Sequence, residues 1–186
     1  MIRRTHALID LDGTLTDSFP AITGSLKLAL AELDLPIPSD EVLRSVVGPP
    51  FELGLPLIGV PGDRLWAVID RYRVHYEAGG LFECELYDGV TAMLDDLVAA
   101  GITLSLATAK PEETAVRIVE HFGLADRFAV LAGATYEPGR RTKDEVITHA
   151  LRELGTDAGA VALATTPADV VALVSGRDVQ MTAPRL

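Results

Sequence analysis

The feature that most restricts the fold of this chain is a short apolar run, Ala7–Ile9, followed by Asp-Leu-Asp-Gly. On a strand, the i, i+2 spacing of Asp10 and Asp12 puts both side chains on one face. Gly13 then allows the backbone to turn sharply. Open α/β sheets bind ligands at the carboxyl edge of their strands. The pattern therefore predicts a buried strand of an α/β sheet with a functional site at its end.

Two carboxylates this close are costly unless a cation neutralises them or one of them keeps its proton. A nucleophile paired with an acid/base, or a site for a hard metal ion, accounts for the pair. An Asx-rich turn without function is the structural alternative. An EF-hand calcium loop is excluded, because counting from Asp10 puts Leu15 at the glycine position and Ala21 at the glutamate position.

Composition limits the class of protein and its partners. The 186 residues are 48% hydrophobic with a formal net charge of −11, which indicates a globular chain and disfavours nucleic acid and anionic membranes as partners. Cys84 is the only cysteine, which excludes an intramolecular disulfide and a cysteine-based zinc site. The sequence has no signal peptide pattern and no apolar run of transmembrane length. We therefore expect a cytoplasmic enzyme.

The pattern of elements changes along the chain. Apolar periodicity predicts that the segment after the first strand is wholly helical, with a long helix capped by Asp63. From Tyr87 onward, amphipathic helices alternate with buried strands, which argues for a parallel sheet with helices on both faces. The predicted strands are 102–107, 128–131 and 161–164, and the predicted helices are 90–100, 111–122 and 143–154. We therefore predict a Rossmann-like α/β core of residues 1–16 and 83–186, with a helical domain inserted at 17–82.

The run Asp-Leu-Asp-Gly-Thr-Leu, from Asp10 to Leu15, resembles the first motif of the haloacid dehalogenase-like phosphohydrolase superfamily. Further segments are similar to its phosphoglycolate phosphatase-like and 5′-nucleotidase-like branch, which carries an inserted helical cap: Gly48–Phe51, Gly80–Glu83, Tyr87–Val90 and Glu120–Leu124. The resemblance implies that Asp10 is the nucleophile that takes the phosphoryl group and that Asp12 is the general acid/base. It also implies a Mg²⁺ ion, held in part by the backbone carbonyl of Asp12.

Two further segments, around Thr108 and Lys143, match motifs of the family. Thr108 follows a predicted buried strand, where a hydroxyl caps the next helix or donates to a phosphate; the resemblance implies that Thr108 and the N–H of Ala109 bind the phosphoryl group. Lys110 is a further candidate for phosphate binding, and a solvated lysine at the start of the helix is its structural alternative. Thr142-x-x-Glu predicts a capping box that places Lys143 in the first helical turn, where the helix dipole disfavours lysine. The resemblance implies that Lys143 balances the charge of the nucleophile.

The last motif departs from the family. Relatives usually end a strand in Gly-Asp, with a second aspartate four residues later, whereas this chain has Ala164 and Thr165 followed by Asp169. The resemblance makes Asp169 a metal ligand together with the motif aspartates, and N-capping is its structural alternative. A second register offers Asp178. Because relatives continue past Val174 with more structure, we expect the end of the sheet to be shortened or rearranged.

The prediction is a Mg²⁺-dependent phosphatase that hydrolyses a small phosphomonoester, phosphoglycolate-like or a nucleoside 5′-monophosphate, through an aspartyl-phosphate on Asp10. The alternative is a degenerate relative that binds a phosphorylated ligand or a partner with weak or no turnover, which Thr165 favours. A phosphomutase would use the same residues. We expect a monomer or a homodimer, and the candidate substrate contacts in the helical domain are Arg44, Arg71, Arg73, His75 and Tyr76.

Overall fold

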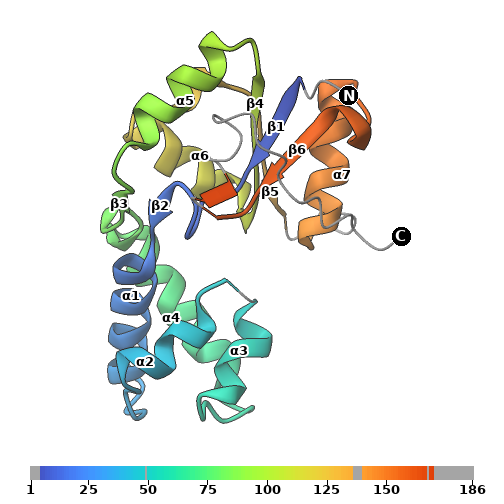
Figure 1. Cartoon of the computed structure of the whole chain (residues 1–186). Coiled ribbons are helices and arrows are strands. Elements are labelled where there is room, and N and C mark those ends of the chain that lie inside the picture. The colour runs from blue at the N-terminus through green and yellow to red at the C-terminus, as the bar shows by residue number, and fades with distance from the viewer. Residues whose placement is uncertain (1–4, 49, 136–139, 167, 170–186) are drawn as a thin grey trace. The chain divides into compact units, whose positions relative to one another are not determined.

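The computed structural model describes residues 5–48, 50–135, 140–166, 168 and 169. The chain divides into two compact units (Figure 1). The first comprises the chain up to Thr16 and from Leu86 onward, and the second is the intervening segment Asp17–Glu85. No helix in the described part of the chain is both long enough and apolar enough to cross a membrane.

The first unit contains a four-stranded parallel sheet in the order β5-β4-β1-β6. Its strands are β1 (His6–Ile9), β4 (Thr103–Pro111), β5 (Phe128–Ala134) and β6 (Val161–Ala164). Strand β1 is internal and pairs with both β4 and β6, with Ile9 opposite Leu106 on one side and opposite Ala164 on the other. The parallel register brings the carboxyl ends of these three strands to one edge, directly beside the Asp10–Asp12 motif.

Helices cover both faces of this sheet, as the alternating pattern predicts. In Figure 1, α5 (Val90–Ala99) and α6 (Glu112–His121) lie on one side, and α7 (Lys143–Leu154) lies on the other. The α7 side packs through a buried apolar cluster: Leu8, Ala107, Ala132, Val146, Ala150 and Val161. The prediction of a Rossmann-like α/β unit is therefore confirmed. The described part of this unit also contains two short 3-10 helices, η3 (Ala125–Arg127) and η4 (Ala158–Ala160).

The second unit is helical. It contains α1 (Phe19–Glu32), α2 (Asp40–Leu43), α3 (Phe51–Leu57) and α4 (Leu65–Glu77), with 3-10 turns η1 (Arg44–Val46) and η2 (Gly80–Phe82). These elements share a core of fully or nearly buried side chains: Leu26, Leu30, Leu43, Val46, Leu55, Val60, Val68 and Ile69. Full burial of each large aliphatic side chain stabilises the fold by roughly 1.5–3 kcal/mol. The unit therefore has a hydrophobic core of its own.

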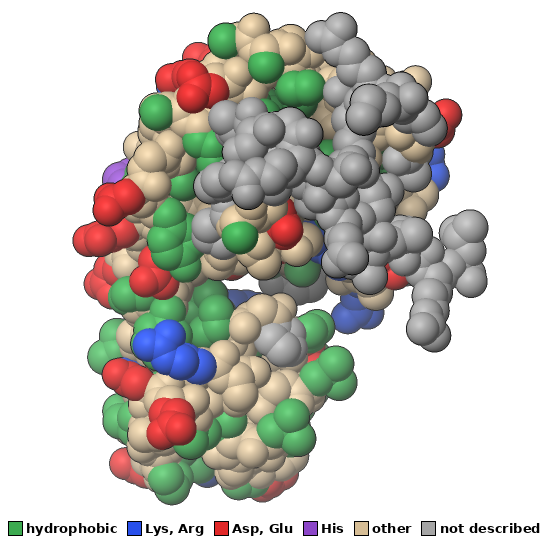
Figure 2. Space-filling model, in the orientation of Figure 1, with side chains coloured by type: hydrophobic (Ala, Val, Ile, Leu, Met, Phe, Trp, Pro, Cys, Tyr) green, Lys and Arg blue, Asp and Glu red, His purple; other side chains and the backbone are tan. Residues whose placement is uncertain are grey.

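Two short strands, β2 (Thr16–Asp17) and β3 (Glu85–Leu86), form a separate two-stranded sheet where the chain leaves and re-enters the first unit. Acidic side chains recur over the visible surface of both units, and few Lys or Arg side chains are seen there (Figure 2). This distribution agrees with the formal net charge of −11.

Some element boundaries differ from the sequence-based prediction. The helix expected to be capped by Asp63 begins at Leu65, with Arg64 at the N-cap and no side-chain cap. Strand β4 continues to Pro111, which is therefore the N-cap of α6 and not its first residue. The residue before a proline is restricted to extended conformations, so Lys110 stays in the strand. A register shift after Ala107 then lets Pro111 pair with Ala134.

Candidate active site

The first two site residues stand on a tight loop that follows β1. The Asp10 N–H donates to the Ala164 carbonyl at 3.0 Å, which ties this residue to the end of β6. The Leu11 carbonyl then accepts the N–H groups of Thr14, Leu15 and Thr16 at 2.9–3.2 Å. Gly13 has a φ of +73°, a conformation that glycine adopts without steric cost. The loop therefore keeps both aspartates at the carboxyl edge of the sheet.

Asp10 is paired with Lys143, the first residue of α7. The Lys143 Nζ lies 2.6 Å from Asp10 Oδ2 and donates to the Ala107 carbonyl, also at 2.6 Å. The other carboxylate oxygen of Asp10 accepts the Leu11 N–H at 2.9 Å. The side chains of Asp10 and Lys143 are 22% and 26% exposed, so the pair is partly open to solvent. Lys143 thus links strands β1 and β4 at the functional edge.

The predicted capping box positions Lys143 and is confirmed. The Thr142 hydroxyl accepts the Glu145 N–H at 3.3 Å, and Glu145 Oε2 accepts the N–H of Thr142 at 2.9 Å. Glu145 also accepts the Arg141 N–H at 2.7 Å. The backbone hydrogen bonds from Thr142 and Arg141 hold the pKa of the Glu145 carboxyl below its usual value. These bonds fix the first turn of α7 and hence the direction in which Lys143 leaves it.

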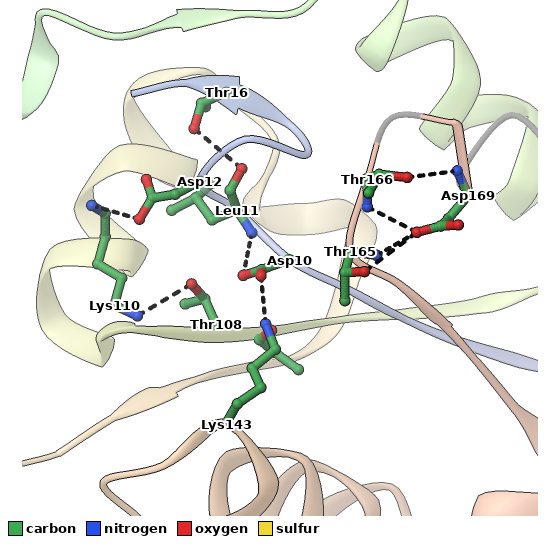
Figure 3. Close-up of polar contacts among 11 residues, drawn as sticks. Asp10, Leu11, Asp12, Thr16, Thr108, Lys110, Lys143, Thr165, Thr166 and Asp169 are labelled. Atoms are coloured by element: carbon green, nitrogen blue, oxygen red, sulfur yellow. Dashed lines mark hydrogen bonds and ion pairs between the residues drawn. The ribbon is translucent and has the colours of Figure 1, made fainter. Parts of the chain in front are cut away.

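Asp12 is paired with Lys110 from strand β4. The Lys110 Nζ lies 2.9 Å from Asp12 Oδ2, and the Lys110 side chain is only 5% exposed. The Lys110 N–H donates to the buried Thr108 hydroxyl at 3.2 Å. Figure 3 shows the result: each aspartate of the motif faces a lysine of its own. Sequence reasoning did not find the Asp12–Lys110 pair, although the scarcity of lysine, three in the chain, was an available signal.

The end of β6 holds Thr165, Thr166 and Asp169. Asp169 Oδ2 accepts the N–H groups of Thr165 and Thr166 at 3.1 and 2.9 Å, and the Asp169 N–H donates to the Thr166 hydroxyl at 3.2 Å. Burial raises the pKa of the Asp169 carboxyl, but these hydrogen bonds outweigh it and bring the pKa below its usual value. The capping arrangement that Thr166 and Asp169 allow is therefore formed. Asp178 and the segment after Val174 lie outside the described residues.

The donor atoms at this edge are oxygens, which are the ligands that Mg²⁺ prefers. Asp10 and Asp12 offer carboxylate and backbone oxygens, and the loop of Thr165 and Asp169 follows the strand next to β1. Within the described residues, no three His, Cys, Asp or Glu side chains gather into a metal cluster. The carboxylate of Asp169 turns toward its own loop (Figure 3), so its part in a metal site stays a prediction.

The candidate contacts named from the sequence in the helical unit all interact within that unit. Arg44 lies over the Phe19 ring at 4.3 Å, and Tyr76 is buried and stacks on Tyr72. Arg71 and Arg73 form ion pairs with Glu32 of α1 and Asp70 of α4, and the His75 Nε2 lies 3.1 Å from a carboxylate oxygen of Glu32.

Comparison with known proteins identifies relatives of this chain. The model of the family described as haloacid dehalogenase-like hydrolase matches residues 7–164. The tyrosine-protein kinase PtkA of Mycobacterium tuberculosis is 41% identical over 79% of this chain, but the match spans only 50% of that protein. A 5′-nucleotidase of Pseudomonas aeruginosa is 36% identical over 83% of this chain and 70% of its own length.

A phosphoglycolate phosphatase of Rhodospirillum rubrum is 32% identical over 88% of this chain and 72% of its own length. Among solved structures, a haloacid dehalogenase-like family hydrolase from Streptococcus pneumoniae superimposes with a TM-score of 0.82 at 26% identity, covering 88% of this chain and 76% of that one. The branch named from sequence motifs is therefore confirmed.

Proposed function

Because the chain belongs to the haloacid dehalogenase-like hydrolase family, we propose that it is a Mg²⁺-dependent phosphatase acting on a small phosphomonoester. The observation that carries this proposal is the position of Lys143, whose Nζ contacts both Asp10 Oδ2 and the Ala107 carbonyl. A cation bound at once to the proposed nucleophile and to a backbone carbonyl of the neighbouring strand β4 lies where a transferring phosphoryl group needs compensating charge.

In the proposed first step, Asp10 attacks phosphorus in line, an Asp10 Oδ–P bond forms and the ester P–O bond breaks. The departing oxygen keeps the bonding electron pair and takes a proton from Asp12. In the second step, Asp12 removes a proton from water, a water O–P bond forms and the Asp10 O–P bond breaks. Free phosphate leaves and both aspartates return to their starting state.

Phosphoryl transfer depends mainly on positioning and on charge compensation at the three equatorial oxygens. Lys143 supplies positive charge from α7, and the Thr108 hydroxyl and the Ala109 N–H are proposed to donate to the same oxygens from β4. Asp10, Asp12 and Asp169 are the proposed residues that hold Mg²⁺. Such an ion would supply positive charge that compensates the charge of the transferring group.

The substrate class rests on the relatives. Those named 5′-nucleotidase and phosphoglycolate phosphatase cover most of this chain, so a nucleoside 5′-monophosphate or a small phosphorylated organic acid is the proposed substrate. We propose that the helical unit serves as the cap that selects the leaving group. Its independent hydrophobic core is what such a separate module requires.

One observation favours a second candidate. The relative with 41% identity is named a tyrosine-protein kinase, so transfer of a phosphoryl group to a protein tyrosine is the alternative activity. The two candidates differ in the final acceptor, which is water in a phosphatase and a tyrosine hydroxyl in a kinase. A protein with neither activity corresponds to the degenerate relative that Thr165 favours.

Release of inorganic phosphate distinguishes these candidates. Wild-type protein is incubated with millimolar Mg²⁺ and a panel of nucleoside 5′-monophosphates, phosphoglycolate and p-nitrophenyl phosphate, alongside EDTA-treated protein and Asp10→Asn. The phosphatase proposal predicts metal-dependent release that Asp10→Asn abolishes. Label transferred from ATP to a tyrosine polymer, without phosphate release from the esters, supports the kinase instead. If the wild type shows neither activity above the level of Asp10→Asn, both candidates are contradicted.

A further inference from the structure

A nearly buried lysine, Lys110, contacts Asp12, the second aspartate of the motif. The Lys110 side chain is 5% exposed and its Nζ lies 2.9 Å from Asp12 Oδ2. An ammonium group out of water is costly unless it is paired and hydrogen-bonded. Asp12, which is 19% exposed, gives Lys110 that partner while keeping part of its own surface open. In this pair, a buried lysine contacts a carboxylate that is still partly accessible to solvent.

The two lysines of the site differ in what they can touch. Lys143 is 26% exposed and belongs to the first turn of α7, whereas Lys110 is inside strand β4 with most of its side chain covered. Figure 3 shows them at different carboxylates, Lys143 at Asp10 and Lys110 at Asp12. A covered side chain that already contacts a carboxylate is poorly placed to meet the phosphoryl oxygens. We therefore expect Lys110 to act on Asp12, whereas Lys143 acts at Asp10 and the phosphoryl group.

The backbone holds Lys110 firmly in place. Its N–H donates to the Thr108 hydroxyl at 3.2 Å, and the following Pro111 restricts it to extended conformations. Pro111 is itself paired with Ala134 of β5. The stem of the lysine therefore starts from a fixed point of the sheet, while Asp12 stands on the loop beyond β1 and has two rotatable side-chain bonds.

We infer that Lys110 is a positioning residue: it holds the Asp12 carboxylate in the orientation from which Asp12 exchanges protons with the leaving group and with water. This inference deepens the proposed function and rests on it. It differs from the phosphate-binding role that the sequence suggests for Lys110. Without Lys110, the Asp12 carboxylate loses the charged partner that lies 2.9 Å from its Oδ2, so its orientation and the direction of proton delivery are less well fixed.

The inference has a kinetic signature. When an alkyl phosphate reacts, the ester oxygen leaves with its electron pair and needs the proton of Asp12 at once. When p-nitrophenyl phosphate reacts, the p-nitrophenolate anion leaves without a proton. Loss of Asp12 positioning therefore slows formation of the aspartyl-phosphate from the alkyl ester much more than from the aryl ester. Loss of a phosphate-binding group slows both esters alike.

The test is single-turnover kinetics of wild type and Lys110→Met with glycerol 2-phosphate and p-nitrophenyl phosphate. Methionine keeps the apolar stem and removes the charge. General acid–base catalysis contributes about 10²–10⁴-fold, so we expect the glycerol phosphate rate to fall by about 10- to 100-fold. The burst of p-nitrophenolate is expected to stay within about threefold, since it needs no such proton transfer. Lys27→Met is the matched control, because this partly exposed lysine pairs with Asp40 in the helical unit.

A double-mutant cycle with Asp12→Asn makes the test specific. If Lys110 acts through Asp12, the double variant is no slower on glycerol phosphate than Asp12→Asn alone. Equal losses on both esters, additive losses in the double variant, or no loss in Lys110→Met each overturn the inference. If Lys110→Met does not fold, as judged by circular dichroism, Lys110→Gln takes its place in the same cycle. A wild-type protein inactive on these esters and on the wider ester panel contradicts the proposed function, and the inference that rests on it falls with it; an active wild type with an unselective Lys110→Met loss contradicts the role of Lys110 alone.

Discussion

Lys143 reaches from the first turn of α7 to Asp10 at the end of β1, with 2.6 Å between Nζ and Oδ2. The same Nζ donates to the Ala107 carbonyl of β4, so one ammonium group connects a helix and two adjacent strands. The capping box formed by Thr142 and Glu145 fixes the start of this helix. The site is thus assembled by backbone elements that are far apart in sequence and adjacent at one sheet edge.

Removing the Lys143 charge is expected to impair the chemical step more than the fold. Loss of one group that compensates transition-state charge costs about 10²–10³-fold in kcat, and we expect Lys143→Met to fall in this range. The free energy of unfolding should change little, because the Asp10–Lys143 pair is partly exposed. Steady-state kinetics and urea titration measure the two effects. A variant with wild-type kcat would show that Lys143 has no catalytic role.

The capping box is expected to contribute to both stability and activity. Replacing an N-cap threonine by alanine typically costs about 0.5–2 kcal/mol, so Thr142→Ala should lower the unfolding free energy by this amount and lower kcat through the displaced Lys143. Thr148→Ala is the control on the same helix, since the exposed Thr148 hydroxyl only bonds back to the Asp144 carbonyl. Equal behaviour of the two variants would argue against the capping role.

The Glu145 carboxyl predicts a pH dependence of stability. Its folded-state pKa is held down by the N–H groups of Thr142 and Arg141, so its contribution is present above the unfolded pKa of about 4.3. That contribution is lost as pH falls through the lower folded pKa. Urea unfolding of wild type and Glu145→Gln should therefore differ at pH 7 and converge in strong acid. A difference that grows on acidification would contradict this sign.

Gly133 is required where β5 meets the start of α6. An added Cβ would collide with the Glu112 Cα and lie 2.6 Å from the Glu112 N and 2.8 Å from the Lys110 carbonyl, all of which are backbone atoms. Overpacking of this kind costs about 1–3 kcal/mol, and Gly133→Ala is expected to lose that much in thermal or urea unfolding. Gly62→Ala, with nothing within 4 Å of its added Cβ, should be nearly neutral.

Thr165 marks the place where the family resemblance expects an aspartate. It follows Ala164, whose carbonyl accepts the Asp10 N–H, so Thr165→Asp would add a carboxylate at the edge proposed to hold Mg²⁺. We expect the Mg²⁺ concentration for half-maximal activity to fall by about tenfold, which corresponds to about 1.4 kcal/mol. Thr166→Asp is the control, since it keeps a capping side chain one residue away. No difference between the two would contradict a metal at this edge.

Much of the core fold follows from local sequence pattern. The buried strands and the helix Lys143–Leu154 were predictable because apolar periodicity and the Thr142/Glu145 capping box act over a few residues. The extension of β4 through Lys110 was not predicted, because it depends on pairing with β5 around a register shift. The helix start at Leu65 was also missed. Here a local capping signal at Asp63 was expected, but the helix begins two residues later without a side-chain cap.

The candidate site was predictable in its residue types and less so in its pairings. The motif indicated Asp10 and Asp12, and the family resemblance assigned Lys143 to Asp10. The contact between Lys110 and Asp12 was not predicted, because it depends on the tertiary packing of β4 beside β1. The sequence allowed two roles for Asp169, a metal ligand or a helix-capping residue. Its carboxylate accepts the N–H groups of Thr165 and Thr166, as the capping role requires.

The central claim is that Asp10 carries the phosphoryl group, and rapid-quench mass spectrometry tests it most directly. Protein mixed with p-nitrophenyl phosphate and Mg²⁺ is quenched in acid on the millisecond scale, digested and searched for the peptide that contains Asp10. We predict a peptide heavier by one phosphoryl group, labile to hydroxylamine, that is absent from Asp10→Asn. Phosphate release by the wild type without this adduct, or the same adduct on another residue, would contradict the claim.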